Sequence, residues 1–368
     1  MIHRVHQLAA SVAIVALVAG ACSSSATPAP TAVPSVAAPS AAASVAAPSA
    51  APSVAPSAAA SPSAAALTVV VIPKQINNPY FDVAFKGAQK AATDLGGTVT
   101  QVGPSAADAT QQVPFIQTAT TQGVSAIVIS ADDATAVAPA LQAAMAAGVK
   151  VVGYDSSPAV GAYNVFVNQA DTAGIGKGLA DMACDEAPNC TGEIAVLSAA
   201  QSATNQNAWI GYMKKELKKY PKMTLVSTVY GNDDPTTATQ VTQGLLEKYP
   251  SLGGIISPTT VGIVAAAGVL DTPKYRGKIA LTGLGTPDSM KKYVADGTVQ
   301  AFELWNPASL GFLAAYAAVN LASSTITNAS GQTFTAGKLG SFTVGADHTV
   351  LLGKPFVFNK GNISQFNF

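Results

Sequence analysis

The stretch Val69-Val70-Val71-Ile72-Pro73-Lys74-Gln75-Ile76-Asn77-Asn78-Pro79-Tyr80-Phe81 decides the fold of this chain. Its apolar, β-branched beginning predicts a buried parallel strand. Asn78 is a good N-cap and Pro79 a good first helical residue, so a helix should begin just after the strand. Ligands of open α/β sheets bind outside the carboxyl ends of the strands. We therefore expect four side chains of this stretch at the rim of a binding site: Lys74, Asn78, Tyr80 and Phe81.

The same order of strand, turn and helix recurs along the rest of the chain. Strands expected near residues 98–102, 126–129 and 150–154 alternate with helices, and a second alternation occupies residues 172–304. Right-handed crossovers make such strands parallel. We predict an α/β fold of two Rossmann-like, doubly wound parallel-sheet domains, joined by a multi-strand hinge with a cleft beside it. The expected lobes are residues 67–169 plus 306–337, and residues 170–305 plus 338–368.

The first 66 residues are expected to lie outside this fold. Arg4, the apolar run 8–19 and the small residues before Cys22 predict a signal peptide over residues 1–21. The segment 18–22 resembles a bacterial lipobox, in which the cysteine is acylated. An ordinary secreted protein with an incidental cysteine is the alternative.

A tether is expected over residues 22–66. Residues 23–66 contain only Ser, Ala, Thr, Pro and Val, so they cannot bury enough apolar surface to fold. The predicted localisation is extracytoplasmic, with the protein lipid-anchored to the cell membrane through Cys22, in the periplasm or on the outer face of the membrane.

Two cysteines remain if Cys22 carries lipid. Cys184 and Cys190 are close in sequence, and in an oxidising compartment they predict a local disulfide. A pair of reactive thiols is the alternative, but no histidine or basic cluster lies nearby in sequence to lower a thiol pKa. The cysteines do not suggest a metal site.

Charge and histidine content exclude several function classes. The formal net charge is zero, 11% of residues are charged, and no basic stripe occurs, so nucleic acid and anionic substrates are poor candidates. The chain after the signal keeps only His348, which argues against histidine-based acid/base or metal chemistry. No phosphate-binding glycine pattern follows a strand. We expect no metal and no cofactor.

Polar side chains with aromatic neighbours follow the predicted strands. A sugar presents hydroxyl groups at its edge and apolar C–H faces, so its site needs multi-donor, multi-acceptor side chains and flat aromatic walls. Helix capping is the alternative role for the pair Asn205 and Gln206, and core packing is the alternative for Tyr80 and Phe81. Beyond the first stretch, the candidate rim residues are Asp155, Asn168, Gln169, Asn205, Gln206, Trp305 and Asn306.

An enzyme would need a nucleophile with its base, or paired carboxylates. The predicted rim offers one aspartate, Asp155, and neither a histidine nor a free cysteine. We therefore expect a binding protein and no catalytic residue, with a hydrolase as the alternative from another class.

Several motifs together resemble the periplasmic-binding-protein type I family, which includes the sugar-binding components of ABC importers. They are Ile72-Pro73-Lys74 with Asn77-Asn78-Pro79-Tyr80-Phe81, Tyr154-Asp155-Ser156 and Leu304-Trp305-Asn306-Pro307. The resemblance covers residues 67–368. It is greatest to the rhamnose-binding and autoinducer-2-binding group, through Asn205-Gln206-Asn207-Ala208-Trp209 among other segments.

The resemblance implies further site residues and a function. Lys74, Asp155, Gln206 and Pro258 match ligand positions of the autoinducer-2 binders, whereas Asn205 and Thr260 replace an aspartate and an alanine there. L-rhamnose is therefore the expected sugar and autoinducer-2 the alternative. The implied protein is a monomeric lipoprotein that delivers a monosaccharide to an ABC permease. A sugar-sensing module for a receptor is a further alternative.

Overall fold

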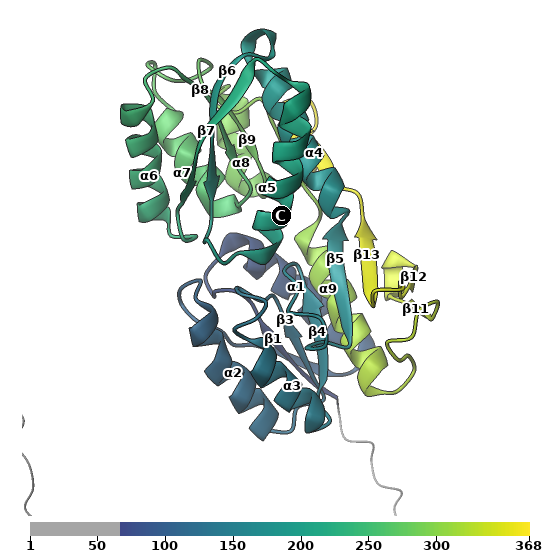
Figure 1. Cartoon of the computed structure of the whole chain (residues 1–368). Helices are drawn as coiled ribbons and strands as arrows, with labels where there is room; N and C mark the ends of the chain where they lie inside the picture. Colours follow the sequence, from purple (N-terminus) through teal and green to yellow (C-terminus); the bar gives the residue numbers. More distant parts are fainter. Residues whose placement is uncertain (1–66) are drawn as a thin grey trace, which may run out of the picture. The chain divides into compact units, whose positions relative to one another are not determined.

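Two parallel sheets organise the chain in a computed structural model that describes residues 67–368 (Figure 1). The larger sheet has six strands in the order β13-β5-β4-β3-β1-β2. Their bounds are β1 Thr68–Ile72, β2 Thr98–Gln101, β3 Ala126–Ile129, β4 Lys150–Tyr154, β5 Val165–Ala170 and β13 Thr349–Gly353. We call this sheet and the helices against it the first lobe. These helices are α1 Pro79–Leu95, α2 Ala109–Thr121, α3 Ala138–Ala146 and α9 Pro307–Ala322.

The second lobe is built on the smaller sheet, whose four strands have the order β7-β6-β8-β9. The strands are β6 Gly192–Ser198, β7 Met223–Tyr230, β8 Leu252–Ser257 and β9 Ala280–Gly283. Its helices are α4 Thr172–Glu186, α5 Thr204–Glu216, α6 Pro235–Lys248, α7 Thr260–Leu270 and α8 Pro287–Ala295. All pairs in both sheets are parallel, so the predicted fold class is confirmed.

Two short antiparallel strand pairs lie outside the two parallel sheets. One joins β10 Ala301–Leu304 to β14 Phe356–Asn359, and the other joins β11 Thr333–Thr335 to β12 Ser341–Thr343. None of the helices within residues 67–368 is long and apolar enough to cross a membrane.

The opening strand is buried on both faces, as its uninterrupted apolar sequence requires. Val69 and Val71 belong to an apolar cluster that also contains residues of α1 and α9. Val70 and Ile72 point to the other face, where they join a cluster with residues of α2 and α3. Asn78 accepts a hydrogen bond from the Tyr80 N–H, so the predicted cap starts α1.

The C-terminal tail contributes a strand to the six-stranded sheet and none to the four-stranded sheet, which corrects the predicted assignment of residues 338–368 to the second lobe. β13 pairs with β5 at the edge of the six-stranded sheet (Figure 1). β14 pairs instead with β10, in a separate two-stranded sheet. A strand edge presents unpaired N–H and C=O groups, and β13 satisfies those of β5. The other predicted lobe boundaries stay a prediction.

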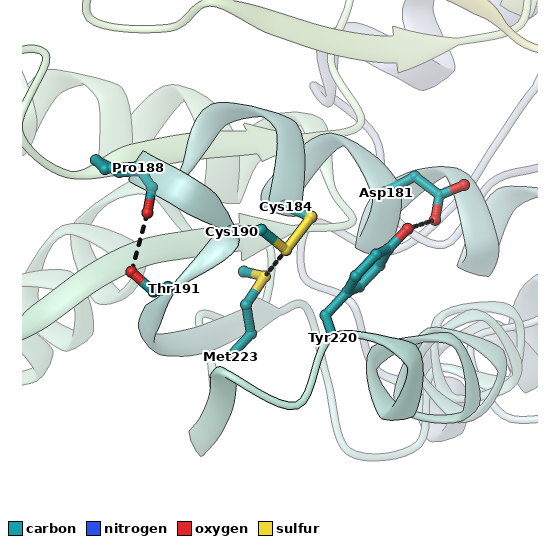
Figure 2. The surroundings of a disulfide bond; sticks show 7 residues. All are labelled: Asp181, Cys184, Pro188, Cys190, Thr191, Tyr220 and Met223. Carbon is teal, nitrogen blue, oxygen red and sulfur yellow. Dashed lines mark hydrogen bonds between the residues drawn. A yellow bond between two sulfur atoms is a disulfide. The ribbon is translucent and has the colours of Figure 1, made fainter.

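A disulfide joins Cys184, near the end of α4, to Cys190 (Figure 2). The Cys190 sulfur lies 3.5 Å from the sulfur of Met223, the first residue of β7. On the same side, the Tyr220 hydroxyl donates a hydrogen bond of 2.6 Å to Asp181 of α4. The end of α4 is therefore bound to the segment that leads into β7.

Candidate functional site

One cavity gathers side chains that follow strands of both sheets. They come from the loops after β1, β4, β7, β8 and β9, from the first turns of α1, α5 and α7, and from the end of β10. This is the carboxyl side of each parallel sheet, where such folds bind ligands. The lining residues are Lys74, Asn78, Tyr80, Phe81, Asp155, Asn205, Gln206, Trp209, Asp233, Pro258, Thr259, Thr260, Leu284, Leu304 and Trp305.

Asp155 is the centre of the polar network in this cavity. Its carboxylate accepts hydrogen bonds from the Ser130 hydroxyl at 2.8 Å and the Tyr80 hydroxyl at 3.0 Å, both in the first lobe. A third, longer bond of 3.4 Å comes from the Asn205 amide of the second lobe. Burial raises the pKa of the Asp155 carboxyl, and the nearby Lys74 charge and the Ser130 and Tyr80 hydroxyls oppose that rise.

The backbone at Asp155 is itself unusual. Its φ of 60° lies in the left-handed region, which is uncommon for a residue other than glycine. Residues held in such conformations cluster at binding sites, where the surrounding structure offsets the strain. The turn after β4 thus directs the carboxylate into the cavity.

Lys74 connects the two lobes. Its ammonium group donates a hydrogen bond of 2.9 Å to the Asn205 side-chain oxygen. The side chain is 3% exposed, so this contact is screened little by water. The Lys74 charge also opposes the burial-induced rise in the pKa of three carboxyls, those of Asp132, Asp155 and Asp233.

An aromatic wall closes another side of the cavity. The Trp305 indole N–H donates a hydrogen bond of 2.8 Å to the Tyr80 hydroxyl, which in turn donates to Asp155. The rings of Trp209 and Trp305 lie 5.8 Å apart, and Tyr80 meets Trp305 edge to face. Burial and the Asp155 charge raise the pKa of Tyr80, so its hydroxyl stays a donor.

The second lobe presents its amides from the first turn of α5. Asn205 accepts a hydrogen bond from the Gln206 N–H as well as from Lys74. The Gln206 oxygen accepts bonds from the Ser198 hydroxyl and the Ala199 N–H, which fixes its amide beside the end of β6. Asn205 and Gln206 both line the cavity, and each also accepts a hydrogen bond from a backbone N–H group nearby in sequence.

The family follows from a comparison of sequences. Residues 69–325 match the family described as periplasmic binding protein domain. The chain belongs to this family. Membership in a family of binding proteins agrees with the predicted fold and with the prediction that the chain is not an enzyme.

Solved structures resemble this periplasmic binding protein over most of its length. A sugar ABC transporter protein from Actinomyces odontolyticus is 45% identical, with 82% of this chain and 98% of that chain covered and a TM-score of 0.66. An ABC transporter solute-binding protein from Clostridium phytofermentas, with L-rhamnose bound, is 38% identical over the same shares, with a TM-score of 0.79. LsrB from Clostridium saccharobutylicum, in complex with AI-2, is 28% identical, covers 82% and 100%, and has a TM-score of 0.78.

Three candidate rim residues do not line the cavity of this periplasmic binding protein. Asn168 and Gln169 lie within β5 and not after it, because β13 pairs with β5 as far as Ala170. Asn306 caps α9, accepting a hydrogen bond of 3.1 Å from the Ser309 N–H. None of the three is among the residues that line the cavity, and their role as ligand contacts stays a prediction.

The sequence reasoning missed four lining residues: Trp209, Asp233, Leu284 and Leu304. Asp233 lies three residues after the end of β7, and its neighbour Asp234 was the more obvious residue as the cap of α6. Trp209 lies one helical turn after Asn205, so its position was also readable from α5. Leu284 and Leu304 carry no polar signal.

Metal binding finds no support within residues 67–368, where no group of three or more His, Cys, Asp or Glu side chains is placed to hold an ion. The cavity can instead offer hydrogen bonds from an ammonium group and amides, and accept them at carboxylates, next to flat aromatic faces. This combination suits a small neutral polyol.

Proposed function

We propose that this periplasmic binding protein is the extracytoplasmic substrate-binding component of a carbohydrate ABC importer, which binds a monosaccharide in the cavity and delivers it to the permease. The observation that carries the proposal is the meeting of carboxylate, ammonium and amide groups with an indole wall in one cavity between two lobes. Sugars are recognised by this combination of planar polar groups and aromatic faces. The relatives from Actinomyces and Clostridium phytofermentas, both described as ABC transporter proteins, support it.

L-rhamnose is the sugar that we propose. It carries a methyl group where other hexoses carry a hydroxymethyl group, and the cavity places Leu284, Leu304 and Pro258 among its lining residues. Burial of a methyl group against aliphatic side chains is favourable, whereas a hydroxyl there would lose its hydrogen bonds. The rhamnose-bound relative at 38% identity supports the same sugar.

AI-2 is the second candidate ligand. Lys74, Asp155, Gln206 and Pro258, which the sequence resemblance matches to AI-2 positions, all line the cavity. Asn205 and Thr260 line it too, in place of the expected aspartate and alanine, and they favour the sugar over AI-2.

A thermal-shift panel tests this proposal. Residues 67–368, which contain both sheets and both apolar clusters, would be heated with L-rhamnose, other deoxyhexoses, pentoses or AI-2. A ligand at about 100 times its Kd should add about 2.7 kcal/mol to the free energy of unfolding. A shift with AI-2 alone would replace the sugar, and no shift with any sugar would contradict the proposal.

We also propose that Cys22 carries lipid and that residues 22–66 tether the protein to the membrane. Both segments lie outside the described residues. In cell fractions, Cys22→Ser should release the protein from the membrane while Ser23→Ala should not. Equal release of the two variants would contradict the anchor.

A further inference from the structure

The loop after β7 brings a second carboxylate to the cavity. Asp233 lines it from the second lobe, and its side chain is 7% exposed. The Thr259 hydroxyl donates a hydrogen bond to one carboxylate oxygen, Oδ1. Among residues 67–368, no hydrogen bond reaches the other oxygen, Oδ2. Asp233 therefore has an acceptor available for a ligand.

The backbone of this loop is held in an uncommon conformation. Asn232 and Asp233 have consecutive φ values of 54° and 49°, both in the left-handed region. The N–H groups of Gly231 and Asn232 donate to the carbonyls of Ser198 and Ala199, at 2.9 and 2.8 Å, so the loop is fixed to the end of β6. Two such residues in succession require support from the surrounding structure.

The first lobe contacts Asp233 directly. The Gln75 side-chain amide, in the loop after β1, donates a hydrogen bond of 3.1 Å to the Asp233 carbonyl. Both side chains are buried. Asp233 thus presents its carbonyl to Gln75 of the first lobe and its carboxylate to the cavity. The contact between the lobes and a contact with ligand would therefore involve the same residue.

We propose that Asp233 is a specificity-determining residue, whose Oδ2 accepts a hydroxyl hydrogen of the sugar when the lobes are closed and Gln75 holds the loop. This inference rests on the proposed function. The sugar must then present hydroxyl donors to two carboxylates, Asp155 from the first lobe and Asp233 from the second. A sugar acid would place a negative charge near both, so the cavity should select neutral sugars.

Charge balance in the cavity supports the same selection. The Lys74 charge opposes the rise in the pKa values of Asp132, Asp155 and Asp233. The charges of Asp132 and Asp155, by contrast, raise the pKa of Asp233 further. One buried ammonium group therefore serves three carboxyl groups. Hydroxyl donors from a neutral ligand satisfy carboxylate oxygens without adding charge.

The test is L-rhamnose binding to residues 67–368, measured by calorimetry and by tryptophan fluorescence, since both tryptophans of the chain line the cavity. Asp233→Asn keeps the size and the carbonyl contact but replaces an acceptor with an amide. Loss of a hydrogen bond to a charged group should raise Kd by about 10- to 100-fold. Asp234→Asn is the matched control, because Asp234 is exposed and asparagine caps a helix equally well.

Gln75→Leu tests the link to the first lobe. It should raise Kd through faster dissociation, and the double variant Gln75→Leu/Asp233→Asn should lose less affinity than the two single losses combined. D-galacturonate should bind at least tenfold more weakly than L-rhamnose. If the affinity losses of the two single variants add up in the double variant, Gln75 does not act through Asp233. If D-galacturonate binds as tightly as L-rhamnose, the cavity does not select neutral sugars.

The outcomes separate this inference from the proposed function. If the wild type binds L-rhamnose and Asp233→Asn binds it as tightly as Asp234→Asn does, Asp233 is not a ligand contact and the importer proposal stands. If the wild type binds no sugar, the proposed function fails and the role of Asp233 fails with it. An Asp233→Asn variant whose ligand-free unfolding temperature falls while Kd is unchanged would make Asp233 purely structural.

Discussion

Glu303 is a buried acid in the strand that leads to the cavity. Burial raises the pKa of its carboxyl to about 8, and the charge of Asp181 adds to that rise. One of its oxygens has no hydrogen-bond partner among the described residues, and the other lies where a Cβ on Gly178 would be 2.9 Å away. Gly178 therefore leaves the space that this side chain fills.

The raised pKa predicts a pH-dependent stability. The folded state binds the Glu303 proton more tightly than the unfolded chain, so this stabilisation is complete below the unfolded pKa of about 4.3. It is lost as pH rises through about 8. Relative to the wild type, Glu303→Gln should therefore gain free energy of unfolding between pH 5 and pH 9, by on the order of 4 kcal/mol.

Urea unfolding at the two pH values measures this difference. The exposed Glu247→Gln on α6 is the control, and it should show the same small difference at both. If the difference in free energy of unfolding between Glu303→Gln and the wild type is the same at pH 5 and pH 9, Glu303 is ionised in the folded protein at both pH values.

At the scale of elements, α1 and α9 approach each other more closely than side chains would allow. A Cβ on Gly311 would lie 1.9 Å from the Ala84 carbonyl oxygen, and one on Gly87 would lie 1.9 Å from that of Ala308. α1 carries Tyr80 and Phe81 in its first turn, and α9 begins two residues after Trp305. The glycine contacts thus hold the aromatic wall in place.

Gly311→Ala should therefore destabilise the protein by about 1–3 kcal/mol or more, because the helices must separate. Gly244→Ala on α6 is a matched control, since nothing lies within 4 Å of the added Cβ. It should stabilise by about 0.5–1 kcal/mol. Urea unfolding compares the two, and equal effects would contradict the close packing of α1 and α9.

The disulfide acts at the same scale, on the connection from α4 to β6. Closing a loop of this length is worth about 2 kcal/mol in the chain-entropy account, so Cys184→Ser/Cys190→Ser should unfold at lower denaturant concentration. Thiol counting on unreduced protein provides the direct check. Two free thiols in residues 67–368 would mean that the bond is absent from the protein in solution.

At the scale of the molecule, hydrogen bonds from Lys74 and Gln75 reach the second lobe at Asn205 and Asp233. Ligand in the cavity should favour the arrangement in which these contacts form, because a ligand shifts an equilibrium toward the state it binds better. Small-angle scattering should show a smaller radius of gyration with L-rhamnose than without it. A sugar that does not bind is the control, and identical curves would count against closure.

Local signals in the sequence were sufficient for much of the fold and part of the site. The alternation of apolar strands with capped helices predicted the α/β class, because each unit depends on residues close together in the chain. The same signals placed Lys74, Asn78, Asp155 and Asn205 after strands or at helix starts, and all four line the cavity.

Tertiary structure alone decided the pairing of β13 with β5, which draws Asn168 and Gln169 into a strand and away from the cavity. It also decided the position of Asp233, whose carbonyl meets an amide 158 residues earlier in the chain. Pairing between distant segments depends on which edges and donors remain unsatisfied after the lobes form, and no local pattern records that. The physical reason is the same for both: a long-range hydrogen bond leaves no periodicity in the sequence.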